Sequence, residues 1–157
     1  MGIEIERKFL IVNEDFKELS FQKKYIKQGY LNSDKNRAVR IRITDNTAFL
    51  TIKGISNVSG MARFEWEKEI SLEEAKELML LCEPGIIEKY RYYHQVGNHV
   101  FEIDEFFGEN EGLLLAEIEL SSENENFAKP SYLGKEVTGN EKYYNSFLSK
   151  NPFKNWA

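Results

Sequence analysis

The sequence predicts a mainly β protein of the α+β class: an eight-stranded antiparallel β-barrel with a few covering helices. Two observations carry this prediction. Eight short segments alternate apolar and polar side chains with a period of two residues, which is typical of half-buried strands. Their connections are short and rich in turn formers, as at Asp45-Asn46 and Val96-Gly97-Asn98, which favours antiparallel neighbours over long parallel crossovers.

The expected strands follow one another at regular intervals. They span about residues 3–10, 25–32, 37–44, 47–53, 61–70, 86–94, 99–106 and 113–120. The clearest helix begins at Ser71, where Ser71 and Glu74 form a capping box, and it ends before Pro84-Gly85. Shorter helices are expected after Asn13 and from Asn140 to Leu148, and all three helices are expected on the outside of the barrel.

Composition limits the class of protein. The 157 residues are 41% hydrophobic and 30% charged, which fits a single folded domain over residues 1–157 and not a disordered chain. The formal net charge of −5 argues against general binding to nucleic acid or to a membrane surface. The lone Cys82 excludes an internal disulfide framework. Without a signal peptide or an apolar run of about 18 residues, the expected location is cytoplasmic.

Full charges occupy one face of almost every expected strand. Residues two apart share a face of a sheet, so Glu4, Glu6 and Lys8 lie opposite Ile5 and Phe9. For a single strand, an ordinary solvated face is the alternative interpretation. Here the acids come in pairs two residues apart and the bases cluster on other strands, which indicates a site. The acids are Glu4, Glu6, Glu65, Glu67, Glu102, Asp104, Glu117 and Glu119, and the bases are Lys8, Arg40, Arg42, Lys53, Arg63, Lys89 and Arg91.

These two groups suit one kind of chemistry. Paired carboxylates offer the hard oxygen ligands that Mg²⁺ or Mn²⁺ prefers, and without a cation they repel one another. Arg offers forked donors that match phosphate oxygens, and Lys offers a compact positive charge. Because phosphoryl transfer depends mainly on positioning and charge neutralisation, the pattern predicts a metal-dependent site for a polyphosphate inside the barrel.

Several motifs also carry a family resemblance. Glu4-Ile-Glu6-Arg-Lys8 matches the N-terminal ExExK signature of the CYTH superfamily, the triphosphate tunnel metalloenzymes, and the chain resembles its short bacterial members. The resemblance continues in order through Gln28–Leu31, Arg40–Arg42, Leu50–Gly54, Arg63–Glu67, Lys89–Tyr92, Ile103–Phe106, Ala116–Glu119, Gly134–Thr138 and Tyr144-Asn145. It implies a barrel whose charged side chains point inward.

The resemblance also implies roles for individual residues. The divalent-metal carboxylates are expected to be Glu4, Glu6, Glu117 and Glu119, with Glu65 and Asp104 as further candidates for a metal or a water. The triphosphate ligands are expected to be Lys8, Arg40, Arg42, Lys53, Lys89 and Arg91, together with Arg63. An ion-pairing role is the alternative for Arg63 and Lys89. The catalytic group is expected to be Glu4, Glu6, Lys8 and Glu119.

The expected activity is metal-dependent removal of the terminal phosphate of a linear triphosphate. Compact bacterial members resemble tripolyphosphatases, so inorganic tripolyphosphate is the expected substrate, with weaker activity on nucleoside triphosphates. The alternatives are a class IV-like adenylate cyclase, a thiamine triphosphatase, or a non-catalytic module that binds polyphosphate. The last is disfavoured, because so many acids in one cavity would repel the ligand unless a metal intervened. The resemblance further suggests a homodimer.

Overall fold

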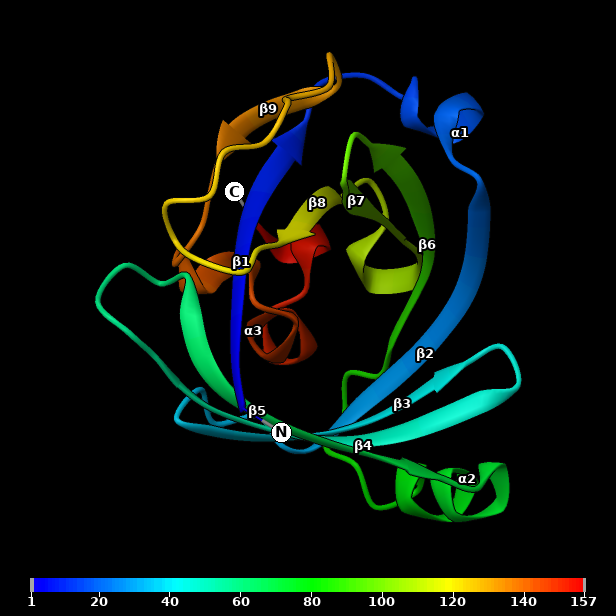
Figure 1. Ribbon diagram of the computed structural model, residues 1–157. Coiled ribbons are helices and arrows are strands. Elements are labelled where there is room, and N and C mark those ends of the chain that lie inside the picture. Colours follow the sequence, from blue (N-terminus) through cyan, green and yellow to red (C-terminus); the bar gives the residue numbers. More distant parts are fainter. Residues whose placement is uncertain (1, 157) are drawn as a thin grey trace.

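Eight strands form a closed antiparallel barrel in the computed structural model of the chain, which describes residues 2–156 (Figure 1). The barrel strands are β1 (Gly2–Ile11), β2 (Gln22–Asn32), β3 (Arg37–Thr44), β4 (Thr47–Ser56), β5 (Ala62–Ile70), β6 (Ile87–Val96), β7 (His99–Phe106) and β8 (Leu114–Glu119). Their order is β5-β4-β3-β2-β6-β7-β8-β1, and the pairing of β1 with β5 closes the ring. The predicted eight-stranded barrel is confirmed.

Strand β1 joins the two ends of the sheet. Its first residues, Gly2–Ile5, pair with β5, and Glu6–Leu10 pair with β8 on the other edge. Beyond the point where β5 ends, a ninth strand, β9 (Leu133–Glu136), pairs with β1 near Phe9 and Ile11. The sequence analysis did not predict β9, because four residues that include Gly134 are too few to show a two-residue alternation.

Most apolar side chains of the strands point outward, and helices cover part of this face, whereas Ile3 and Phe64 on β1 and β5 remain exposed. Helix α2 (Leu72–Met79) packs its buried Ala75 on Ile41 and Ala48, outside β3 and β4. The predicted capping box is present, with the Glu74 amide donating to the Ser71 hydroxyl and the Ser71 amide donating to the Glu74 carboxylate, both at 3.0 Å. Helix α1 (Phe16–Leu19) buries Phe16 against β6 and β7, with Tyr132 beside it. This packing lies outside the barrel wall, so charged side chains take most of the inward-facing positions. The exception is an apolar cluster at one end of the barrel that includes Ile87, Phe106 and Leu115.

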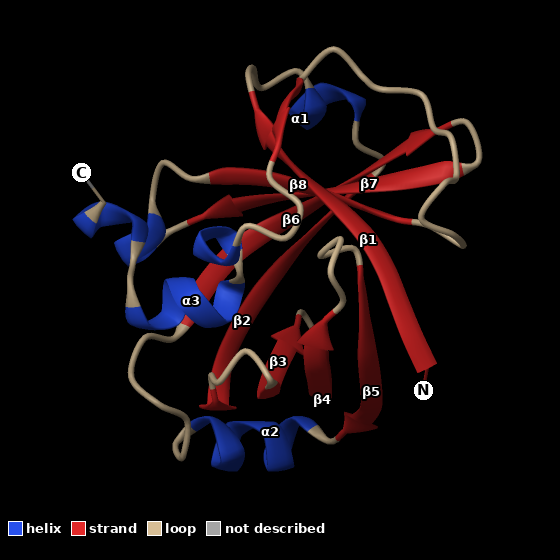
Figure 2. Ribbon diagram, turned by 90° about the vertical axis from the view of Figure 1, so that its left-hand side faces the viewer, coloured by secondary structure: helices blue, strands red, loops and turns tan. Residues whose placement is uncertain are grey.

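The C-terminal helix differs from the prediction in extent and in position. A 3₁₀ turn, η2 (Glu141–Tyr143), and an extended Tyr144 precede α3 (Asn145–Lys150), so residues 140–148 are not one helix. The Tyr143 carbonyl accepts a hydrogen bond from the Lys8 ammonium at 3.0 Å instead of continuing a helical ladder. Helix α3 lies across one end of the barrel, not on its outer wall (Figures 1 and 2), and buries Leu148 among Ile87 and Phe106.

Two further 3₁₀ turns complete the described chain, η1 (Gly108–Asn110) and η3 (Phe153–Asn155). Within residues 2–156, no helix combines the length and the apolar character needed to span a membrane.

Candidate active site

The barrel contains a cavity of about 250 Å³, and more than half of the residues that line it are charged. Twelve of the thirteen predicted site residues line it, and Asp104 is the exception. Seven basic and seven acidic side chains face this space, so their formal charges cancel when all are ionised. They are Lys8, Arg40, Arg42, Lys53, Arg63, Lys89 and Arg91, with Glu4, Glu6, Glu65, Glu67, Glu102, Glu117 and Glu119.

The two kinds of charge come from different parts of the barrel. We call Glu4, Glu6, Glu117 and Glu119 the carboxylate wall; they stand on β1 and β8, where Glu6 lies opposite Glu119. We call Arg40, Arg42, Lys53, Lys89 and Arg91 the basic wall; they stand on β3, β4 and β6. Strand order places β3, with Arg40 and Arg42, away from β1 and β8 in the ring, whereas Lys53 on β4 and Arg91 on β6 reach the carboxylate wall. An anion can therefore contact the basic wall while cations neutralise the other side.

Two members of the carboxylate wall, Glu6 and Glu119, differ from the other two in their ion pairing. Within residues 2–156 neither Glu6 nor Glu119 forms an ion pair, whereas Glu4 contacts the Lys53 ammonium at 2.9 Å. Burial and the neighbouring negative charge of Glu117 raise the pKa of Glu6 well above its usual range. Burial and the Glu4 charge also raise the pKa of Glu119. These two carboxylates favour the arrival of a proton or a metal cation.

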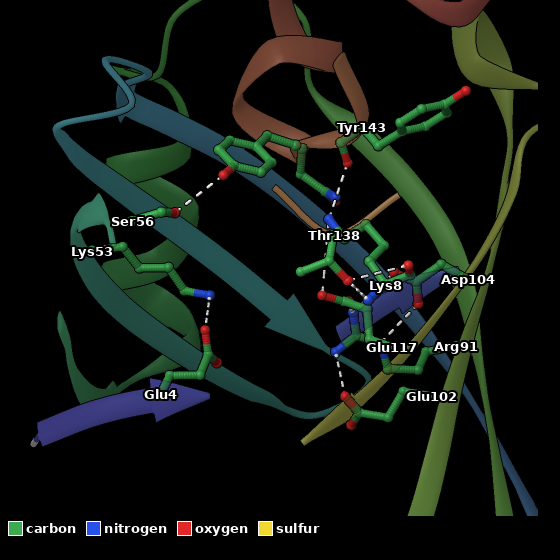
Figure 3. A network of polar contacts seen from close by, with 12 residues as sticks. Glu4, Lys8, Lys53, Ser56, Arg91, Glu102, Asp104, Glu117, Thr138 and Tyr143 are labelled. Carbon is green, nitrogen blue, oxygen red and sulfur yellow. Dashed lines mark hydrogen bonds and ion pairs between the residues drawn. The ribbon is translucent and has the colours of Figure 1, made fainter. Parts of the chain in front are cut away.

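Glu117 and Glu4 behave differently because bases reach them. Burial would raise the pKa of Glu117, but the charges of Lys8 and Arg91 outweigh it and hold this pKa well below the usual range. The corresponding distances are 3.9 Å from Lys8 Nζ and 3.4 Å from Arg91 Nη2 (Figure 3). Likewise, Lys53 outweighs burial and lowers the pKa of Glu4. The wall thus combines two ionised carboxylates with two that are harder to ionise.

Two arginines of the cavity have no carboxylate partner within residues 2–156. Arg42 donates its Nε–H to Gln28 at 2.8 Å, and Arg63 donates to the Gly54 carbonyl at 3.1 Å, but neither forms an ion pair. Burial, with Arg40 and Arg91 nearby, lowers the pKa of Arg42 to about 9, so it remains charged near neutral pH. Such buried positive charge is costly unless an anion compensates it.

Arg40 gives a more specific indication. Its Nη2 donates to Thr51 at 3.2 Å and lies 3.7 Å from a Glu67 oxygen. Its Nε–H is buried without an acceptor, the one side-chain atom of this kind in the described part of the chain. Because buried donors are nearly always paired, this group points to a ligand oxygen as its missing acceptor.

Asp104 belongs to a separate ion-pair cluster. Both of its oxygens are engaged, with Arg91 Nε at 2.7 Å, Arg91 Nη2 at 2.9 Å and the Lys89 ammonium at 2.7 Å (Figure 3). Burial opposes ionisation of Asp104, but the charges of Arg91 and Lys89 outweigh it and lower its pKa to about 2. Asp104 therefore holds Arg91 and Lys89 in place, and its expected role towards a metal or a water stays a prediction.

Uncharged residues that belong to the family motifs, but to which the sequence analysis gave no role, organise the basic wall. Asn145 Oδ1 accepts from Lys89 at 2.7 Å and from the Gln28 amide at 2.8 Å, and Gln28 in turn accepts from Arg42. Thr51 links Arg40 to Glu67 in the same way. Gln28 and Thr51 occupy inward-facing positions of β2 and β4, so their parity was the available signal. Nothing in the local sequence brings Asn145, at the start of α3, to Lys89.

The carboxylate wall fits a divalent cation by its chemistry. Hard oxygen donors are the ligands that Mg²⁺ and Mn²⁺ prefer, and among residues 2–156 Glu6 and Glu119 of this wall form no ion pair, whereas Glu4 and Glu117 do. Within residues 2–156, no three His, Cys, Asp or Glu side chains are already gathered closely enough to hold a metal ion. The donor set is therefore present on neighbouring strands but is not a pre-formed cage.

Comparisons with known proteins agree with this geometry. An inorganic triphosphatase of Acetivibrio thermocellus is 48% identical over 157 residues, 99% of each chain. An inorganic triphosphatase of Nitrosomonas europaea is 32% identical and covers 93% of this chain and 96% of its own. A crystal structure of an inorganic triphosphatase superposes with a TM-score of 0.65 at 31% identity, covering 93% of this chain and 97% of that one. The model of the CYTH domain family matches residues 2–151, and the chain belongs to this family.

Proposed function

We propose that this protein hydrolyses the terminal phosphoanhydride bond of inorganic tripolyphosphate and depends on a divalent cation, Mg²⁺ or Mn²⁺. The observation that carries the proposal is the separation of unpaired charge inside one cavity. Among residues 2–156, Arg42, Arg63 and the Nε–H of Arg40 lack anionic partners, while Glu6 and Glu119 lack cationic ones. A linear polyanion that arrives with metal cations satisfies both groups at once.

Charge balance supports the participation of metal. The lining is formally neutral, so entry of a polyanion alone would leave a large negative excess in a space with little water. Glu4, Glu6, Glu117 and Glu119 are the residues that would hold the cations. Bound there, a divalent cation supplies Lewis-acid stabilisation of the phosphate oxygens and lowers the pKa of water.

The basic wall supports the chemical step. A water oxygen bonds to the terminal phosphorus while the bond between this phosphorus and the bridging oxygen breaks. The products are orthophosphate and pyrophosphate. In this reaction negative charge shifts onto the oxygens around the leaving group, and fixed guanidinium and ammonium groups stabilise it. Asn145 and Asp104 orient Lys89, and Gln28 orients Arg42, so these donors need little rearrangement when substrate enters.

The relatives support the choice of substrate. Two proteins that align over almost the whole chain are named inorganic triphosphatases. An unsubstituted triphosphate also suits a cavity of about 250 Å³ whose lining is mostly charged.

Phosphate release from a panel of compounds tests the proposal. Tripolyphosphate, pyrophosphate, ATP, GTP and thiamine triphosphate are incubated with and without Mg²⁺ or Mn²⁺, and the ATP reaction is analysed for cyclic AMP. We expect fast, metal-dependent release from tripolyphosphate and none from pyrophosphate. Cyclic AMP with pyrophosphate would identify a cyclase instead, and tight binding without turnover of any compound would identify a polyphosphate-binding module.

A further inference from the structure

A second cavity adjoins the charged one, and none of the residues proposed to bind phosphate or metal lines it. It has a volume of about 310 Å³ and lies between the loop after β4 and the segment that precedes α3. We call it the outer cavity. Five residues line both spaces and so form the boundary between them: Ser56, Gly60, Thr138, Gly139 and Tyr144.

Tyr144 is the largest residue of this boundary. Its hydroxyl and that of Ser56 are 3.1 Å apart and share a hydrogen bond (Figure 3). The centre of its ring is 5.6 Å from the Lys8 ammonium and 5.5 Å from the Arg63 guanidinium. The ring therefore stands between two cations of the charged cavity and the outer cavity. A group that extends from one space into the other crosses this boundary, of which Tyr144 is the largest side chain.

The loop and the segment that bound the outer cavity are held in close contact. A Cβ atom added to Gly60 would lie 2.4 Å from the Gly139 Cα, and both glycines have a φ of 78°. Asn57 and Ser59 are anchored on Glu123 by hydrogen bonds of 2.9 and 2.6 Å. These contacts fix the loop that lines the outer cavity, and Tyr144 is the aromatic residue of this lining.

The lining of the outer cavity is unlike that of the charged one. Its one basic residue, Lys35, is paired with Glu141 at 2.5 Å, so no unpaired cation is available for another phosphate. Ile55 and Val58 are exposed at 64% and 107%, beside the Tyr144 ring and the hydroxyls of Ser56 and Ser59. A lining that combines an aromatic ring and apolar side chains with hydroxyl and amide groups, such as Asn57, suits a sugar and a heterocyclic base, and the volume is that of a small-molecule site.

We propose that the outer cavity receives the nucleoside of a substituted triphosphate whose phosphates occupy the charged cavity, and that the contact between Tyr144 and Ser56 restricts this mode of binding. The inference rests on the proposed function for the position of the phosphates only. Tyr144 is then the residue that determines selectivity. An unsubstituted phosphate chain leaves the Tyr144–Ser56 hydrogen bond intact, whereas a nucleotide must break it.

Binding measurements test this proposal without turnover. Calorimetry with Mg²⁺ gives the Kd of β,γ-methylene ATP and that of methylene-bridged tripolyphosphate for wild type, Tyr144→Phe and Ser56→Ala. Both variants lose the hydrogen bond and keep an aromatic ring at position 144, near Lys8 and Arg63. We expect the preference for the inorganic analogue to fall by about 3- to 10-fold in each, the value of one ordinary hydrogen bond. Tyr90→Phe is the matched control, because Tyr90 packs edge-to-face against Phe107 outside the barrel, with ring centres 4.7 Å apart.

A variant that fills the outer cavity should act in the opposite direction. Val58→Trp adds bulk at a fully exposed position, so folding is not at risk. We expect it to raise the preference for the inorganic analogue at least 3-fold. Preferences equal to wild type in Tyr144→Phe, Ser56→Ala and Val58→Trp would overturn the proposal. If tripolyphosphate is not hydrolysed but these shifts occur, the proposed function fails and the outer cavity remains assigned.

Discussion

Asp104 and Glu6 are both carboxylates that point into the barrel, yet their surroundings differ completely. Asp104 is 2% exposed and accepts three short contacts from Arg91 and Lys89, and its pKa is lowered to about 2. Glu6 has no ion pair among the described residues, and burial with Glu117 nearby raises its pKa. Two inward-pointing carboxylates can therefore differ in whether other side chains already engage their oxygens. Those of Asp104 are engaged by Arg91 and Lys89, whereas those of Glu6 form no ion pair among the described residues.

Substitution of Asp104 tests whether this carboxylate stabilises the fold. Asp104→Asn removes the charge that compensates Arg91 and the fully buried Lys89, so we expect the free energy of unfolding to fall by about 3–5 kcal/mol. Denaturant unfolding measures this. Glu102→Gln is the control, because its 3.5 Å contact with Arg91 is partly exposed and should contribute less than about 1 kcal/mol. Equal losses in the two variants would show that Asp104 is not the centre of a buried cluster.

Glu6→Gln should have the opposite profile. Because Glu6 is a partly buried acid without an ion pair among residues 2–156, its neutralisation should leave the melting temperature unchanged or raise it, while metal-dependent kcat falls on the order of 100-fold or more. Thermal unfolding and phosphate release are measured on the same preparation. Glu105→Gln, on the outer face of β7, should keep both values. Wild-type turnover in Glu6→Gln would remove Glu6 from the proposed metal ligands.

Arg42 extends the comparison to the basic side chains. Its guanidinium has no carboxylate partner in the described chain, so Arg42→Ala should raise KM for tripolyphosphate by about 10-fold or more, with a smaller change in kcat. Arg7→Ala should leave KM unchanged, because Arg7 pairs with Glu136 at 2.6 Å outside the tunnel. An unaltered KM in Arg42→Ala would mean that this unpaired cation does not bind phosphate.

Acid titration gives the smallest and most specific effect. The pKa of Asp104 is lowered from 3.8 to about 2 on folding, so its contribution to stability is complete above about pH 4 and is lost as the pH falls towards 2. The unfolding free energy of wild type should therefore decline more steeply between pH 4 and pH 2 than that of Asp104→Asn. Parallel curves would contradict the lowered pKa.

The barrel and twelve residues of its cavity wall followed from the sequence because strand geometry enforces a period of two. Side chains at positions such as Glu4, Glu6 and Lys8 must share a face, whatever the tertiary structure. Parity could not distinguish Asp104 from Glu102, since both point inward. Their difference depends on the register that sets Asp104 opposite Arg91 and on the approach of Lys89 from the same strand.

Contacts between distant parts of the chain explain what the sequence analysis missed. The hydrogen bond from Lys8 to the Tyr143 carbonyl joins residues 135 positions apart, and it accompanies the interruption of the expected helix over residues 140–148. The role of Asn145 depends on Lys89 and Gln28, which lie on other strands. Local patterns carry no information on such pairings, and the outer cavity depends on the same kind of contact.

One edge of β1 pairs first with β5 and then with the C-terminal segment. This pairing bears on the order in which the chain folds. Lys8 donates its backbone amide to Thr138 and accepts from the Val137 amide, so the first strand is completed by residues synthesised about 130 positions later. Contacts of such long sequence separation form slowly, because loop closure precedes any gain. During translation the N-terminal acids and bases must remain without most of their partners, and catalytic competence can arise only once the C-terminal segment has emerged.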